Sequence, residues 1–147
     1  MRLSLQVQYA ISSVFDLAYN GHGDPVQVRV VSERQGIPAR YLEQIFRRLR
    51  RAELVLSKRG PGGGYTLARP PSRITLRDVI EAVEGPLSQT LAMEGDPSPP
   101  ERPSFLGPAL ARRLGEALAA VAFDAVCRDA ERLGVPRVKH EAPMYFI

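Results

Sequence analysis

The sequence has few of the residues on which enzymatic and metal chemistry most often depends. It contains one cysteine, Cys127, two histidines and no tryptophan. A single cysteine excludes a disulfide within the chain and a metal or cluster site built only from cysteines, and it is typical of a reducing compartment. His22 and His140 lie far apart in the sequence and predict no metal site. We therefore expect a protein that is not an enzyme and that has no metal or other cofactor.

Long apolar runs are also missing from this chain. No stretch approaches the roughly 20 apolar residues of a membrane span, and residues 1–6 hold no apolar run of signal-peptide length. We therefore expect neither membrane insertion nor secretion, and a cytoplasmic location. With 147 residues, 44% of them hydrophobic, the chain can form one or at most two small domains with a real core.

Positive charge is concentrated in the first part of the chain. Residues 1–85 hold 13 basic and 8 acidic side chains, a net charge of +5, whereas residues 86–147 hold 7 and 8, a net charge of −1. Residues 29–59 alone hold 9 basic and 3 acidic side chains, a net charge of +6. A segment of this kind favours an anionic partner such as nucleic acid.

The spacing of apolar residues predicts a helix, a tight turn and a second helix. From residue 6 to residue 19 the apolar side chains recur at intervals of three and four, the period of a helix with one buried face. Turn-forming residues at 20–25, Gly21, Gly23 and Pro25 among them, end this helix. A short segment then ends at Gly36, and Pro38 stands where the next helix could have its first residue.

The segment of residues 40–52 is the most informative. Leu42, Ile45, Phe46 and Leu49 fall on one helical face, which must pack inward. The opposite face consists of long polar side chains that point to solvent, namely Arg40, Glu43, Gln44, Arg47 and Arg51, with Arg48 and Arg50 on its flanks.

A β-hairpin and a short helix follow. Residues 54–59 and 65–69 predict two strands, joined by the glycine-rich run of residues 60–64 and with Lys58 and Arg59 beside its tip. The run lacks the Gly-Lys-Ser/Thr ending of a phosphate-binding loop, so a hairpin tip is favoured. Thr75 and Asp78 resemble a capping box at the start of a helix that ends at Gly85.

The second part of the chain predicts a linker and an amphipathic helix. Residues 86–107, rich in proline and glycine, are expected to form a linker loop. From Leu106 to Ala125 apolar residues recur at intervals of three and four, and Gly134 and Pro136 close the pattern. This predicts one long helix, or a helix broken near Ala122. Its apolar stripe exceeds what a thin N-terminal domain covers, so we expect a homodimer.

Together these elements predict a winged helix-turn-helix protein that binds double-stranded DNA. The expected fold class is mainly α with a small β-hairpin wing (α+β), with a DNA-binding domain at 1–85, the linker at 86–107, and a dimerisation helix and C-terminal tail at 108–147. In the major groove, arginine pairs with guanine, glutamine with adenine, and glutamate accepts from cytosine. The alternatives are a solvated charged face and a winged-helix module that binds RNA or another protein.

Three segments resemble the Rrf-two (Rrf2) family of bacterial regulators, namely YLEQIFRRLR at 41–50, RGPGGGY at 59–65 and DVIEAV at 78–83. The resemblance spans residues 1–87 and implies a dimeric winged-helix regulator, in most cases a repressor. It implies base-reading positions for Arg40, Glu43 and Gln44, a minor-groove position for Arg59 and a phosphate contact for Arg2. The predicted DNA-binding set is Arg2, Arg40, Tyr41, Glu43, Gln44, Arg47, Arg51, Lys58, Arg59, Gly62 and Gly63.

The sequence also departs from that family's pattern. Family members often have serine at the position of Pro38, so Ile37 is expected to cap the helix, a role for which it is poorly suited. Cluster-binding members carry three cysteines in the segment that corresponds to residues 91–105, and this sequence has none there. An acidic ligand used by some members corresponds to Gln8, a poor substitute for a carboxylate. We therefore expect no iron-sulfur cluster.

The remaining sequence resembles the cluster-free branch of the family, the repressor of cysteine metabolism, through residues 84–88 and 141–147. In that system the repressor pairs with cysteine synthase, which accepts a C-terminal isoleucine of another partner. Tyr145, Phe146 and Ile147 are therefore predicted to dock on such an enzyme through the terminal carboxylate and an apolar anchor. The alternative is that they pack on their own domain or dimer mate.

For Cys127, a redox switch and a small core residue are the two interpretations.

Overall fold

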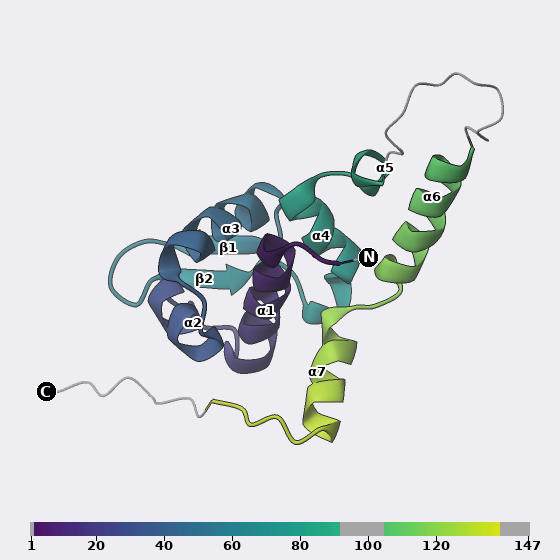
Figure 1. The fold of residues 1–147 in the computed structure, drawn as a ribbon. Coiled ribbons are helices and arrows are strands. Elements are labelled where there is room, and N and C mark those ends of the chain that lie inside the picture. The colour runs from purple at the N-terminus through teal and green to yellow at the C-terminus, as the bar shows by residue number, and fades with distance from the viewer. Residues whose placement is uncertain (1, 92–104, 139–147) are drawn as a thin grey trace, which may run out of the picture.

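The structure, a computed structural model, describes residues 2–91 and 105–138, and in this part it is mainly helical with one two-stranded hairpin (Figure 1). The predicted fold class is confirmed. In chain order the elements are α1 (Leu5–Asn20), α2 (Val28–Gln35), α3 (Ala39–Arg51), β1 (Val55–Lys58), β2 (Gly64–Leu67), the 3-10 helix η1 (Pro71–Arg73), α4 (Leu76–Glu84), α5 (Leu87–Thr90), α6 (Leu106–Ala119) and α7 (Phe123–Arg132). None of the described helices is long and apolar enough to cross a membrane.

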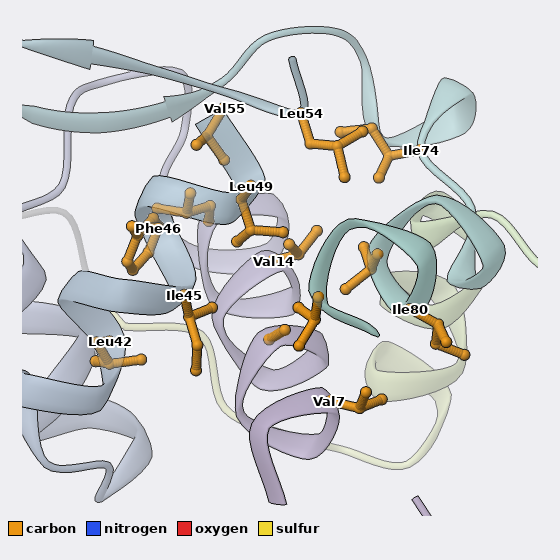
Figure 2. Close-up of a cluster of buried hydrophobic side chains, with 14 of the residues drawn as sticks. Val7, Val14, Leu42, Ile45, Phe46, Leu49, Leu54, Val55, Ile74 and Ile80 are labelled. Atoms are coloured by element: carbon orange, nitrogen blue, oxygen red, sulfur yellow. The ribbon is translucent and has the colours of Figure 1, made fainter. Parts of the chain in front are cut away.

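Helix α1 is central to the hydrophobic core and packs against α2, α3, α4 and α7. The Ser4 hydroxyl caps its first turn by accepting a hydrogen bond from the Val7 N–H at 3.2 Å. The core-facing residues of α1 and α3 recur at helical spacing, as predicted, and meet side chains from α4 and the hairpin (Figure 2). They are Val7, Ala10, Val14, Leu17, Leu42, Ile45, Phe46 and Leu49. Burial of one such aliphatic or aromatic side chain contributes about 1.5–3 kcal/mol.

The turn between α2 and α3 ends one residue later than the sequence suggests. Gly36 adopts a left-handed conformation with φ 64°, and the Ser32 hydroxyl donates to the Ile37 carbonyl at 2.6 Å. Pro38 is the N-cap of α3, with ψ 130°, and not its first helical residue. The prediction that Ile37 caps the helix is therefore wrong, because its side chain is buried in the core and the α3 helix begins at Ala39.

The hairpin pairs β1 with β2 in antiparallel register, Val55 opposite Leu67 and Lys58 opposite Gly64, and both strands are shorter than predicted. Near the tip, Tyr65 of β2 exchanges two backbone hydrogen bonds with Val26, at 2.8 and 2.9 Å. The Tyr65 ring stacks on Phe46 of α3 with centroids 4.5 Å apart. The hairpin is therefore fixed both to α3 and to the segment that precedes α2.

Gly64 permits the close approach between the hairpin and Val26. Its φ is +143°, and a Cβ at this position would lie 2.4 Å from the Val26 carbonyl carbon. A side chain there would collide with backbone, which cannot move without breaking the Val26–Tyr65 pair. Glycine is therefore required for this junction.

The expected capping box opens α4. The Thr75 hydroxyl accepts from the Asp78 N–H at 3.2 Å, and the Asp78 carboxylate accepts from the Thr75 N–H at 2.9 Å. The chain on either side of Thr75 also pairs with the segment that separates α6 from α7. Leu76 N–H donates to the Val121 carbonyl at 3.0 Å, and Phe123 N–H donates to the Ile74 carbonyl at 2.9 Å.

This pairing explains why the second part of the chain forms two helices. The break at Ala120–Ala122 lies where the sequence offered one as the alternative to a single long helix. Extended backbone at Ala122 allows the buried Phe123 to enter the core, and α7 then packs against α1 (Figure 1).

The described part of the predicted linker is not entirely loop. Residues 87–90 form the short helix α5, and α6 begins at Leu106. The Glu81 carboxylate accepts a hydrogen bond from the Leu87 N–H at 3.1 Å, and Leu87 is buried. The prediction of a loop across all of residues 86–107 is therefore wrong at its two ends, and residues 92–104 lie outside the described part of the chain.

Candidate nucleic-acid interface

Helix α3 presents the polar face that its sequence predicts. One side of the helix is fully occupied by core residues, so the side chains about 180° away face solvent. All five predicted residues of this face are exposed: Arg40, Glu43, Gln44, Arg47 and Arg51. Because α3 follows the tight turn after α2, it has the place of the recognition helix in a helix-turn-helix unit.

Arg40, near the N-terminal end of α3, is held by its aromatic neighbour. Its guanidinium lies 4.8 Å from the centroid of the Tyr41 ring and donates a hydrogen bond to the Tyr41 hydroxyl at 3.1 Å. Tyr41 in turn contacts Tyr9 of α1, with ring centroids 6.1 Å apart. This support restricts a long, exposed side chain, which lowers the entropy lost when it binds. The sequence placed Tyr41 in the site, but not its support by Tyr9.

Arg48 does not belong to the exposed face. It is half-buried, and its guanidinium donates to the Gln6 side-chain oxygen at 2.9 Å and to the Val83 carbonyl at 2.8 Å. The residue thereby connects α3 to the first turn of α1 and the last turn of α4. Sequence spacing placed Arg48 on the flank of a solvated face. It could not predict these two partners, because they lie 42 and 35 residues away and leave no signal in the neighbouring sequence.

The hairpin tip presents the other predicted contacts. Lys58, Arg59 and Gly62 are exposed, and Gly62 adopts a left-handed conformation with φ 69°. Gly63 is buried, donates from its N–H to the Gly60 carbonyl at 2.9 Å, and has no room for a Cβ beside the Lys58 carbonyl. Gly63 therefore shapes the turn, whereas Lys58 and Arg59 supply its charge.

Arg2 is exposed just before the first turn of α1. That turn carries Gln6, which contacts Arg48 of α3, so the start of the chain lies near the C-terminal half of the recognition helix. The predicted partner-binding residues Tyr145, Phe146 and Ile147 lie outside the described residues.

Cys127 lies away from this interface, on α7, and is partly buried. Burial raises the pKa of its thiol, an effect larger than that of the nearby charged side chains. The thiol is therefore protonated at neutral pH and is a weak nucleophile, which favours a packing role over a redox switch.

Two helices joined by a tight turn, the second with an exposed basic face, and a hairpin with a basic tip define the winged helix-turn-helix class. A family model for Rrf2, described as an iron-dependent transcriptional regulator, matches residues 3–122. This chain therefore belongs to the Rrf2 family of transcriptional regulators.

Individual relatives agree with this assignment. The chain is 47% identical over 90 residues to the HTH-type transcriptional regulator IscR of Escherichia coli O1:K1, a match that covers 61% of this chain and 56% of that protein. Its fold is similar to the structure of CymR, the global cysteine regulator of B. subtilis, with a TM-score of 0.72, 29% identity and coverage of 88% and 98%. The IscR structure of T. potens gives a TM-score of 0.71, 32% identity and 94% coverage of both chains. The matches to curated relatives span less than two thirds of those proteins.

The family description names iron, but the described residues do not bring together a set of donors that fits an iron centre. Among the described residues, no group of three or more histidine, cysteine, aspartate or glutamate side chains could hold a metal ion. Cys127, the single cysteine of the sequence, lies on α7 and is partly buried there. The segment of residues 92–104 contains neither cysteine nor histidine.

Proposed function

We propose that this protein is a homodimeric repressor that binds an imperfect DNA palindrome. The observation that carries this proposal is the exposed basic face of α3 beside a basic hairpin tip, in a member of a transcription-regulator family. In this arrangement α3 enters the major groove and the hairpin contacts the flanking backbone or minor groove.

Each predicted side chain has a chemical role in this proposal. Arg40, Glu43 and Gln44 read bases, through guanine, the cytosine amino group and adenine respectively. The positive charges of Arg2, Arg47, Arg51 and Lys58 neutralise phosphates, while Arg59 enters the minor groove. Tyr41 supports Arg40, and the exposed Gly62 lets the hairpin tip approach the duplex.

The second copy is proposed to cover α6. Phe105 and Leu110 are 66% and 57% exposed, and Leu106 is exposed beside them, so this end of α6 presents an apolar stripe to solvent. Such a stripe is typical of an interface between subunits. Two recognition helices would then read half-sites separated by roughly one helical turn of DNA, about 34 Å, or a multiple of it.

Control of cysteine or sulfur metabolism, without an iron-sulfur cluster, is the finer proposal. It is supported by the similarity to CymR, by the missing cysteines in residues 91–105 and by the chain's C-terminal residues. The C-terminal Tyr145, Phe146 and Ile147 would dock on cysteine synthase. A pull-down tests this point: deletion of Ile147 should abolish synthase binding, and unchanged binding would contradict it.

Selection of genomic DNA fragments with the purified protein tests the main proposal. We expect enrichment of a palindrome that binds far more tightly than its scrambled sequence at two salt concentrations. Sites beside sulfur-assimilation genes would support the metabolic assignment. Equal, salt-sensitive binding to every duplex would contradict a sequence-specific repressor and would favour the alternative of a basic surface for RNA or protein.

A further inference from the structure

Residues 133–138 follow α7 and run past the C-terminal end of α1 (Figure 1). We call this segment the C-terminal strap. We infer that the end of α1, formed by Tyr19 and Asn20, is a binding site for the backbone of the strap, and that a docked strap strengthens DNA binding by holding α2. The inference rests on the proposed DNA-binding function.

The strap is held by specific polar contacts. The buried Tyr19 hydroxyl donates to the Val135 carbonyl at 2.7 Å. The Val138 N–H donates to the Asn20 side-chain oxygen at 2.9 Å, and the Arg137 guanidinium lies 4.6 Å from the centroid of the Tyr19 ring. Two main-chain groups and one side chain of the strap are therefore recognised by residues more than 115 positions earlier.

Hydrophobic burial contributes little to this docking. Leu133 is 81% exposed, and Val135 and Val138 are about 40% exposed. Two hydrogen bonds and one exposed cation–π contact are weak interactions in water compared with burial of large apolar side chains. The strap can therefore detach without unfolding of the core.

Asn20 connects the strap to a buried carboxylate. Its side-chain NH₂ donates to Asp16 Oδ1 at 3.1 Å, and Asp16 is completely buried. Two residues of the last turn of α2 donate to the same carboxylate, Gln35 at 2.9 Å and Arg34 at 3.3 Å. Asp16 therefore joins α1 to the end of α2. Asn20 is hydrogen-bonded both to Asp16 and to the strap, so it connects the two.

Release of the strap is expected to act on α2 through this network. Without the Val138 N–H, Asn20 loses the bond that fixes its orientation toward Asp16. Buried polar networks are sensitive to such losses because each bond supports the next. The last turn of α2 precedes the tight turn that orients α3, so a partner that draws the strap away would weaken binding to the operator.

A matched pair of variants in the full-length protein tests the inference. Val138→Pro removes the N–H that donates to Asn20, whereas Val138→Ala keeps it and serves as the control. We expect Val138→Pro to lower operator affinity about fivefold relative to Val138→Ala, the lower end of typical coupling effects. Asn20→Ala should lower it at least as much, and Val138→Pro should add nothing in the Asn20→Ala background. Thermal unfolding verifies that each variant is folded.

Two outcomes would overturn the inference. Equal operator affinity of Val138→Pro and Val138→Ala would exclude the coupling and leave the proposed function intact. If the wild-type protein selects no DNA sequence, the proposed function fails. The coupling between the strap and α2 is then tested separately, through the NMR signals of the Gln35 side-chain amide. They should shift in Val138→Pro but not in Val138→Ala, and unchanged signals in both would refute it.

Discussion

Glu43 and Arg59 stand at positions from which they should affect DNA binding differently. Arg59 lies at the exposed hairpin tip, so Arg59→Ala should weaken binding to the selected operator by about 1 kcal/mol or more and reduce its salt dependence. Glu43 is exposed on α3 and is proposed to read a base, so Glu43→Ala should relax base preference more than affinity. Fluorescence anisotropy with single-base variants of the operator measures both effects.

Arg128→Ala is the control for these two variants, because Arg128 lies on α7 and pairs with Asp124. It should bind the operator as the wild-type protein does. If Glu43→Ala and Arg59→Ala changed binding to random and selected DNA by the same factor, the assignment of their roles would be wrong.

The close approach between Gly64 and Val26 should contribute to the stability of the fold. Gly64→Ala would place a Cβ 2.4 Å from the Val26 carbonyl carbon and should lower the free energy of unfolding by about 3 kcal/mol or more. Gly62→Ala is the matched control, because it also has positive φ but open space around it, and it should cost about 1–2 kcal/mol. Urea denaturation distinguishes them, and equal losses would show that the collision with Val26 is unimportant.

The raised pKa of Cys127 predicts slow alkylation. Iodoacetamide should modify the folded protein severalfold more slowly at pH 8 than it modifies the urea-unfolded chain, and the rate should rise as the pH passes the raised pKa of the thiol. Since folding raises this pKa, the stability that the thiol contributes is complete below the unfolded pKa and is lost as the pH rises through the folded one. Rapid modification of the folded protein at pH 7 would contradict the packing role.

At the scale of elements, α1 and α2 are joined by one buried carboxylate. Asp16→Ala would leave Arg34, Gln35 and Asn20 without their shared acceptor, so it should destabilise the protein by about 3 kcal/mol. Glu33→Gln, which breaks an exposed pair with Arg29 on the same helix, should cost less than about 0.5 kcal/mol. Denaturant midpoints measure both, and similar values would show that Asp16 does not hold α2.

Arg48 illustrates why elements are easier to predict than their connections. The apolar period of α3 identified its buried face, because side chains at intervals of three and four share one side of a helix. The same period said nothing about Gln6 or the Val83 carbonyl, which fold next to Arg48 from distant parts of the chain. The orientation of the recognition helix thus depends on contacts without a local sequence signal.

At the scale of the whole molecule, the exposed stripe of α6 predicts the oligomeric state. Leu110→Glu should convert the proposed dimer to a monomer by placing a charge in its interface, and should weaken binding to the full palindrome more than tenfold. Ala119→Glu is the control, because Ala119 is exposed and nine residues away, on the opposite side of the helix. Sedimentation equilibrium measures the mass, and a dimeric Leu110→Glu would place the interface elsewhere.

Local sequence patterns were sufficient to predict the features that depend on neighbouring residues. Periodic apolar residues predicted α1 and α3, Thr75 and Asp78 predicted the capping box, and the glycine-rich run predicted the hairpin. The exposed face of α3 followed as well, because it is the complement of a buried face on the same helix. These signals act within a few residues, where covalent geometry fixes which side chains can meet.

Contacts between distant residues depended on the tertiary structure. The break between α6 and α7 is fixed by pairing with residues 74–76, and the N-cap of α3 lies at Pro38 because Ile37 is needed in the core. The strap meets Tyr19 and Asn20 more than 115 residues away in sequence. Such contacts form where burial of the core brings segments together, and their energies depend on partners that no local pattern records.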